Sequence, residues 1–346
     1  IGYTSGGDET DSEVKAYIRD SAITSSGDLN LTAVASQKIN SVVIAGSAAI
    51  AASGTTGVAV SGSGVWAENK IGVDVHSFID GDGDTGISAN TMSLTAQDTS
   101  GIFSHAGAAS IAAGFAGTTG VSVSVGVSFA RNSISTTVES YIKNADQGVT
   151  STGGDIVIKA EETANIKSIA WAASLAAGFG GTTGIAVSGA GVEAKNIILT
   201  GVESFITDSQ ITSAGDVELE ALNTASIDAF ILSASVAVAG GGTAGVGASI
   251  GVSLARNYIG YNPDNEAVYD YTLGDEPDSI TKGDRVKITE GVRQGDVYEY
   301  VGDDNLPDED DSGDENYLLL QDFSDKSLWK LVNLDKNAAP VQAYIR

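Results

Sequence analysis

One segment of this chain recurs four times, and the repetition limits the possible folds more than any other feature. A Gly-Thr-Thr-Gly turn, or a close variant of it, ends at Gly57, Gly120, Gly184 and Gly245, so successive copies lie 63, 64 and 61 residues apart. Repeats of this length are typical of proteins in which each copy stacks against its neighbours. We therefore expect a stack of copies, although 346 residues would usually form two or three separate domains.

Within a copy, the residues alternate in a way that indicates β-strands. The pattern is clearest at 117–132, where large apolar side chains fall on one parity and Ser, Gly or Ala on the other. A period of two is typical of a strand with two different faces. Small side chains allow a second sheet to come close, so we expect both faces to be covered over much of each strand. The large residues are Val121, Val123, Val125, Val127 and Phe129.

The predicted fold class is all-β, with tandem long antiparallel β-hairpins stacked into an elongated, solenoid-like shaft. The Gly-Thr-Thr-Gly turn joins 117–132 to a preceding Ala- and Ser-rich segment at 105–116, which favours a hairpin. Each arm is expected to run for roughly 20 residues, or about 70 Å. A lone hairpin of that length would leave its edges unpaired, so stacking of the hairpins is required.

The chain is predicted to contain three parts: four repeats at 1–261, an inserted β-module at 262–340, and the first strand of a next repeat at 341–346. The insert holds 21 acidic and 7 basic residues, a net charge of −14. Its composition predicts three short strands at 283–288, 296–301 and 328–332, linked by an acidic loop at 303–315.

The two ends of the chain carry matching sequences. Val14-Lys-Ala-Tyr-Ile-Arg19 matches Val341-Gln-Ala-Tyr-Ile-Arg346, and Ile1-Gly-Tyr3 matches 259–261. The match indicates either a section of a longer repeat protein or a subunit that joins head to tail by strand complementation. We therefore expect the chain to partner with itself. The expected assembly residues are Val14, Ala16, Tyr17, Ile18, Val341, Ala343, Tyr344 and Ile345.

A formal net charge of −27 argues against nucleic acid as a partner and favours cations. The sharpest local motif is Asp80-Gly-Asp-Gly-Asp-Thr-Gly86, in which Asp80, Asp82 and Asp84 could direct several oxygens at one Ca²⁺. It departs from the EF-hand loop at Thr85 and Thr91. The alternatives are a calcium site and a polar turn between strands.

Three aromatic residues of the insert, Tyr298, Tyr300 and Trp329, form a candidate platform for a sugar ring. The alternative is that they are the core of a small module that has little else to bury. A recurring Asn closes the second strand of each copy, where it either stacks into a ladder or caps the strand. The four residues are Asn69, Asn132, Asn196 and Asn257.

No catalytic group can be singled out, so we do not expect an enzyme. The only histidines, His76 and His105, lie in different repeats, and the chain has no Cys. Carboxylate pairs occur throughout so acidic a chain and identify no acid and base. Aromatic girdles and a wide lipid-facing apolar band are missing from the pattern, so no membrane insertion is expected.

The phrase Ile23-Thr-Ser-Ser-Gly-Asp-Leu-Asn-Leu-Thr-Ala33 and its counterpart at 211–221 resemble the repeats of giant bacterial surface proteins of the filamentous haemagglutinin and adhesin type. The resemblance implies an elongated all-β shaft, an extracellular or cell-surface location, and adhesion or matrix building. The long arms depart from it, because they lack the corners of a regular β-helix. The expected function is a structural subunit or repeat segment of an extracellular fibre or filament; the alternative is an adhesin stalk whose insert binds glycans.

Overall fold

The computed structural model describes residues 12–260, 269–275, 277, 279–290, 296–302, 306–307, 317–323, 325, 327–332 and 341–346. The chain divides into two compact units. The first, here called the solenoid, comprises Ile1–Ile259 and Pro340–Arg346. The second, here called the insert unit, comprises Gly260–Ala339.

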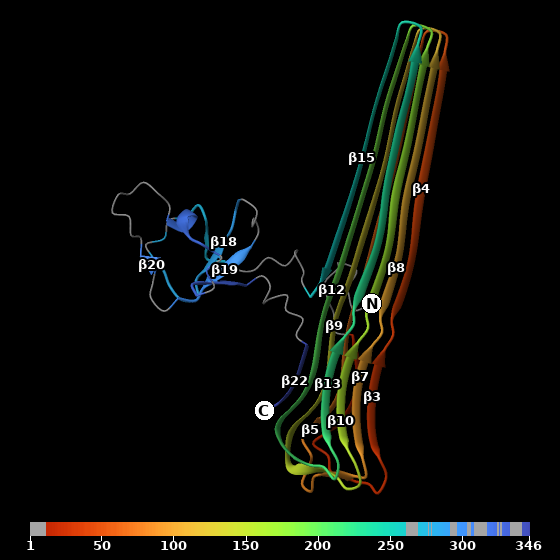
Figure 1. The fold of residues 1–346 in the computed structure, drawn as a ribbon. Helices are drawn as coiled ribbons and strands as arrows, with labels where there is room; N and C mark the ends of the chain where they lie inside the picture. Colours follow the sequence, from red (N-terminus) through yellow and green to blue (C-terminus); the bar gives the residue numbers. More distant parts are fainter. Residues whose placement is uncertain are drawn as a thin grey trace. The chain divides into compact units, whose positions relative to one another are not determined.

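The solenoid consists of four coils, and each coil runs through a 7-residue strand, a 16-residue strand and a long return strand (Figure 1). The first coil contains β3 (Leu29–Ala35), β4 (Lys38–Ser53) and β5 (Thr56–Asp80). The later coils contain β7 (Met92–Asp98), β8 (Gly101–Ala116) and β9 (Thr119–Ser151), then β10 (Ile156–Glu162), β11 (Asn165–Gly180) and β12 (Thr183–Thr212), then β13 (Val217–Asn223), β14 (Ser226–Gly241) and β15 (Ala244–Ile259).

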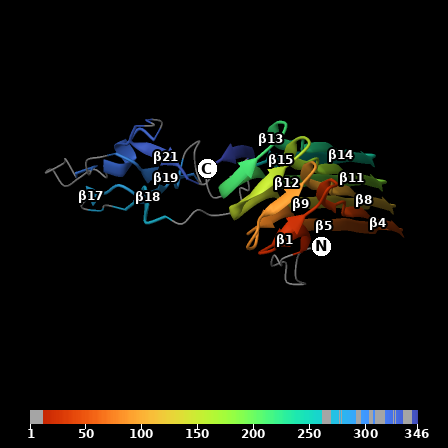
Figure 2. The same cartoon turned by 90° about the horizontal axis from the view of Figure 1, so that it is seen from below.

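Equivalent strands of successive coils pair in parallel and form three sheets. The 7-residue strands make the proximal sheet, in the order β13-β10-β7-β3, and the 16-residue strands make the distal sheet, in the order β14-β11-β8-β4. The return strands make the long sheet, β1-β5-β9-β12-β15, which also holds β2 (Ile23–Thr24), β6 (Ile87–Ala89) and β22 (Val341–Ile345). β1 spans Glu13–Arg19. Seen from below, the distal sheet lies opposite the long sheet (Figure 2).

The prediction of antiparallel hairpins is wrong, because the two arms on either side of each Gly-Thr-Thr-Gly turn do not pair with each other. β4 pairs with β8 of the next coil, so that Ile39 lies beside Ile102, and β5 pairs with β9 in the same way. The arms β4 and β5 instead pack face to face through their side chains. Alternation of residues describes a strand face in either arrangement, so it could not distinguish a hairpin from an arch between two layers.

The regular recurrence of the repeats favours the parallel arrangement physically. In a parallel in-register stack, each residue lies beside the residue at the equivalent position of the next coil, so that recurring side chains such as those of Asn69 and Asn132 form ladders along the stack. A coil needs few corners here, because it is flattened into two long layers. These corners lie at 36–37, at 54–55 and at the polar turn after the return strand, as in the first coil.

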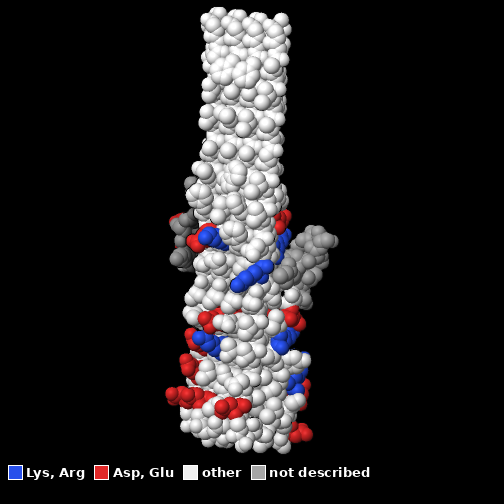
Figure 3. Space-filling model, turned by 90° about the vertical axis from the view of Figure 1, so that its right-hand side faces the viewer, with Lys and Arg blue, Asp and Glu red and all other residues white. Residues whose placement is uncertain are grey.

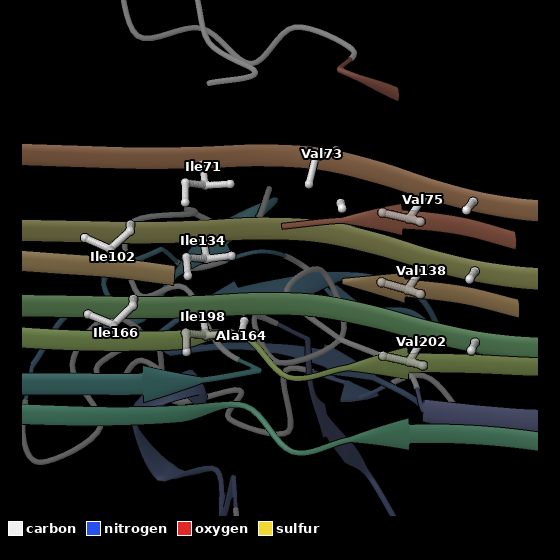
Figure 4. Close-up of a cluster of buried hydrophobic side chains, with 14 residues drawn as sticks. Ile71, Val73, Val75, Ile102, Ile134, Val138, Ala164, Ile166, Ile198 and Val202 are labelled. Atoms are coloured by element: carbon white, nitrogen blue, oxygen red, sulfur yellow. The ribbon is translucent and has the colours of Figure 1, made fainter. Parts of the chain in front are cut away.

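The proximal half of the solenoid has a core of large aliphatic side chains between the proximal sheet and the second half of the long sheet. Figure 4 shows that equivalent residues stack through the coils, with Ile71, Ile134 and Ile198 in one ladder. All three are fully or almost fully buried. A second ladder is formed by Val75, Val138 and Val202.

The distal half has the opposite distribution of residue size. In β9, Ser122, Ser124 and Ser128 are fully buried and point between the layers, whereas Val125 on the other face is 44% exposed. The same holds in the first coil, where Val60 is 65% and Ile50 is 77% exposed. Small side chains do admit a second sheet, as expected. The other expectation, that both faces are covered, is not met within the described part of the chain, because the large apolar face points outward.

Glycine allows the two distal layers to approach closely. A Cβ atom added to Gly178 in β11 would overlap the carbonyl oxygen of Ile185 in β12, and one added to Gly114 would overlap the carbonyl oxygen of Val121. Serine hydroxyls join the layers in the same region. Ser124 donates to Ser110 at 2.9 Å, and Ser188 donates to Ser174 at 2.9 Å.

The insert unit interrupts the long strand of the fourth coil. β15 ends at Ile259 beside Ile198, and β22 begins at Val341 beside Val202, while β12 continues through 199–201 without a break. β15 and β22 are therefore two parts of one return strand.

The insert unit has its own small sheets. The three short strands expected there are present as β18 (Arg285–Lys287), β19 (Val297–Tyr300) and β21 (Trp329–Leu331), paired antiparallel, with β16 (Tyr271–Thr272) added parallel to β18. β17 (Ser279–Ile280) pairs with β20 (Leu306–Pro307), and a short 3-10 helix spans Tyr317–Leu320. Of the acidic loop expected at 303–315, all but 306–307 lies outside the described residues.

Candidate functional site

The recurring asparagines form a ladder through the interior. The Nδ2 of Asn69 donates to Oδ1 of Asn132 at 2.8 Å, Asn132 donates to Asn196 at 2.7 Å, and Asn196 donates to Asn257 at 2.8 Å. The ladder reading of these residues is confirmed. Each amide donates to the next coil and accepts from the previous one, so the ladder fixes the register between coils as well as satisfying buried polar atoms.

The aromatic residue that marks each copy also stacks along the coils. Tyr17 lies on Phe78 with ring centroids 5.1 Å apart, and Phe78 lies on Tyr141 at 4.9 Å. Tyr141 lies on Phe205 at 4.7 Å, and Phe205 lies on Tyr344 of β22 at 5.3 Å, with every pair within 9° of parallel. The aromatic ladder therefore runs through the whole stack, from β1 to β22.

The proposed assembly strands β1 and β22 occupy equivalent positions at opposite ends of the stack. Val14 of β1 lies beside Val75, and Val341 of β22 lies beside Val202. Within the described residues, each strand pairs on one side only, so the other side presents unpaired backbone groups. The two sets of residues are Val14, Ala16, Tyr17 and Ile18 in β1, and Val341, Ala343, Tyr344 and Ile345 in β22.

The three aspartates of the candidate calcium loop lie at the turn after β5, and two of them already bind protein groups. Asp80 accepts from Nδ2 of Asn144 at 2.8 Å and lies 3.4 Å from Nζ of Lys143. Asp82 is buried and accepts from the backbone N–H of Gly148 at 2.5 Å, while Asp84 is exposed. No group of three or more acidic or metal-ligating side chains converges among the described residues. Calcium binding here stays a prediction.

The aromatic residues of the insert unit lie in its hydrophobic core. Tyr298, Tyr300 and Trp329 are each at most 6% exposed. The ring of Tyr300 meets Trp329 edge-on at 5.2 Å, and Phe323 packs against both Tyr298 and Trp329. The structure thus places these rings where the alternative, a core role, expects them.

The two histidines serve different neighbours. The Nδ1 of His76 lies 3.2 Å from Glu139 on the next coil. His105 accepts a hydrogen bond from Nε1 of Trp171 at 3.0 Å on the outer face of the distal sheet. They belong to different sheets and make no shared site.

Two buried carboxyl groups lie beside each other where the proximal sheet ends. Asp98 and Glu162 are 0% exposed and occupy the same position in the second and third coils. Glu162 accepts from Oγ1 of Thr136 at 3.1 Å and from the backbone N–H of Ala164 at 2.6 Å. Asp98 accepts from Ser100 through Oδ1, and its buried Oδ2 has no hydrogen-bond donor. The fourth coil carries Asn223 at this position.

Burial and proximity explain how this pair ionises. Burial, together with the charge of Asp98, raises the pKa of Glu162 to about 8, and burial also raises the pKa of Asp98. A proton on one carboxyl can be donated to the unpaired oxygen of the other. At neutral pH, which lies below this pKa, Glu162 is therefore mostly protonated.

Sequence reasoning overlooked this pair, although the signal was present. Met92, Leu94, Ala96 and Asp98 fall on one parity, so an acidic residue lies on the apolar face of a strand. A carboxyl group at such a position is predicted to be buried.

No protein-family model matches this chain, and neither a curated protein nor a solved structure matches it. The described residues include no helix that is both long and apolar enough to cross a membrane.

Proposed function

We propose that the chain is a structural element, a rigid β-solenoid segment of an extracellular fibre or cell-surface filament that extends by strand pairing. The observation that carries the proposal is the presence of unpaired, in-register sheet edges at both ends of the stack. Edge strands β3 and β4 lie at one end and β13 and β14 at the other. Because every coil presents the same ladders, an added coil meets the contacts that neighbouring coils already make.

The ladders support a mechanical role. Backbone pairing, the asparagine ladder and the aromatic ladder all run along the stacking direction, so a load applied in that direction is shared by many bonds in parallel. A contact between the β1 surface of one copy and the β22 surface of another is heterologous. Such contacts generate open filaments when successive copies do not close into a ring. In a sample of the purified chain, the next coil comes from a second copy.

The alternative, a stalk whose insert binds glycans, has less support. Its three candidate rings pack against each other and against Phe323 in the insert core. An extracellular or cell-surface location remains part of the proposal through the family resemblance, and calcium at Asp80, Asp82 and Asp84 remains an optional ligand.

A proline placed on the free side of β22 tests the proposal. The backbone N–H of Arg346 donates to Ile206, so the N–H groups at alternate positions point toward β12, and that of Ala343 points away from it. Ala343→Pro removes a donor that only an added strand would use, and its ring blocks close approach. Ala343→Val is the matched control, since it keeps the N–H group.

Electron microscopy and sedimentation of the whole purified chain provide the readout. We expect the wild type and Ala343→Val to form filaments or end-to-end oligomers, and Ala343→Pro to form shorter ones. Equal filament lengths for all three, or a wild type that does not associate at any concentration, would contradict the proposal.

A further inference from the structure

The outer face of the distal sheet is an apolar surface without charge. Its outward side chains come from alternate residues of β4, β8, β11 and β14, and only Lys38, Lys167 and Asp228, at the starts of their strands, are charged. Figure 3 shows a face of the solenoid on which Lys, Arg, Asp and Glu gather in one half and are absent from the other. We call the uncharged part of the outer surface of the distal sheet the distal face. It runs from residue 42 in β4, 105 in β8, 169 in β11 and 230 in β14 to the end of each strand.

Large side chains on the distal face are well exposed. Ile44 is 61%, Phe230 59% and Leu232 51% exposed, and Phe115, Leu175 and Phe179 are between 38% and 45% exposed. Four strands about 4.8 Å apart, each contributing 12 residues to the face at about 3.3 Å per residue, give the face an area of about 760 Å². The largest apolar patch of a typical monomer is about 300–600 Å². The distal face therefore exceeds what a soluble surface usually leaves uncovered.

The face is also rigid and shaped. Phe115 and Phe179 stack with centroids 5.7 Å apart, and Trp171 is held by its hydrogen bond to His105. A row of small residues crosses the sheet between two rows in which three of the four residues are large. The row consists of Gly46, Ala109, Ala173 and Ala234.

From this geometry we infer that the distal face packs against the distal face of a second copy of this chain. An isologous pair uses the same surface twice, and the uncharged rows need no matching charges on the partner. An area of about 760 Å² per copy is close to the share of one partner in a stable interface of standard size, about 800 Å². The face also carries Trp, which is enriched among the residues that dominate binding at interface centres, and Phe, which is enriched at interfaces.

A lipid bilayer fits the face less well. The distal sheet is open at both β4 and β14 within the described residues, so each edge presents a row of unpaired N–H and C=O groups. In hydrocarbon each such group costs several kcal/mol. In a pair of copies, the edges of the distal sheet stay in water or pair with further coils. Covering the distal face with a second copy therefore leaves no unpaired backbone group in hydrocarbon. This inference does not depend on end-to-end stacking.

Sedimentation velocity of the whole chain, with a charge placed in the face, gives the first test. Leu175→Lys puts an ammonium group beside the small-residue row, on a side chain that already points outward. Ser93→Lys, outward on the proximal sheet, is the matched control. We expect the wild type and Ser93→Lys to form dimers at micromolar concentration, and the dimer constant of Leu175→Lys to weaken at least tenfold. Equal dimerisation of all three, or a monomeric wild type at 100 times that concentration, would overturn the inference.

Crosslinking separates face-to-face pairs from end-to-end stacks, because the chain has no native Cys. Ala173→Cys places one thiol in the small-residue row, and a short bis-maleimide should join two copies in face-to-face pairs only. Ser93→Cys is the control and should not crosslink. Failure of Ala173→Cys to crosslink in a sample that sediments as a dimer would overturn the inference, while the proposed stacking would still stand. Binding of the chain to neutral phosphatidylcholine vesicles, with Ala173→Cys uncrosslinked, would assign the face to lipid instead.

Discussion

The two halves of the solenoid share one backbone arrangement but place their large residues on opposite sides. In the proximal half, Ile71, Ile134 and Ile198 fill the interior, and charged residues such as Lys159 and Glu161 face water. In the distal half, Ala and Ser fill the interior and Val or Phe point outward. The comparison teaches that parallel in-register pairing does not require an aliphatic core. The distal half is also the part of the solenoid whose large apolar side chains are exposed on the outer surface.

The largest expected effect comes from the proximal core. Ile134→Ala removes a fully buried side chain from the middle ladder and should lower the free energy of unfolding by about 4 kcal/mol. Val125→Ala, on the outer face of the same strand, is the matched variant and should cost less than about 1 kcal/mol. Urea denaturation of both variants measures the difference. Equal losses would mean that the two halves are not packed as described.

The close approach of the distal layers predicts the next effect. Gly178→Ala would place a Cβ against the carbonyl oxygen of Ile185 and push the layers apart, at a cost of about 2–3 kcal/mol. Gly189→Ala adds the same methyl group to the outer face, where the nearest atom outside its chain neighbours is 4.0 Å away, and should be close to neutral. Thermal unfolding of the two variants compares them. A neutral Gly178→Ala would refute the tight distal interior.

The buried acid pair predicts an unusual pH dependence. Since the pKa of Glu162 is raised from 4.5 to about 8 on folding, the folded chain binds more protons than the unfolded chain between these values. Stability should therefore fall as pH rises through this window, by up to about 1.4 kcal/mol per pH unit for one proton. Glu162→Gln should remove the slope and stabilise the chain at pH 8.

The neighbouring, half-buried Glu161 provides the control for that experiment. Glu161→Gln should leave the slope between pH 4.5 and 8 in place, because its side chain points to the outer face beside Lys159. Denaturation midpoints measured across this pH range provide the test. A wild-type chain whose stability rises with pH over the window would contradict the assignment.

The smallest expected effect concerns the asparagine ladder. Asn132→Ala breaks two ladder hydrogen bonds, to Asn69 and Asn196, and should cost about 2 kcal/mol. Asn257→Ala, at the end of the ladder, breaks one bond and should cost about half as much. Hydrogen exchange of neighbouring backbone amides reports both. The reverse order of effects would show that the ladder does not run through the stack.

The sequence predicted the period and the strands, and it offered the asparagine ladder as one of two alternatives, because all three depend on residues that recur at 61–64 positions. It did not predict which strands pair. The alternation of residues around Ile39 and Ile102 is the same in an antiparallel hairpin and in a parallel stack. It also did not predict that Val125 faces outward, because alternation identifies two faces without saying which is inside. For the candidate sites, Asp98 had a readable parity, whereas the partners that Asp80 and Asp82 find at the turn depend on coils more than 60 residues away.

Disulfide trapping in the Cys-free chain tests the parallel stack most directly. The account predicts that Ala113→Cys with Ala177→Cys forms a disulfide under mild oxidation, since these residues are direct neighbours on β8 and β11. An antiparallel hairpin about the Gly-Thr-Thr-Gly turn at 117–120 would instead pair Ala113 with Ser124, which in the stack points to the interior while Ala113 points outward. Peptide mass spectrometry of the two double variants decides between them. A disulfide in Ala113→Cys with Ser124→Cys, and none in Ala113→Cys with Ala177→Cys, would contradict the fold.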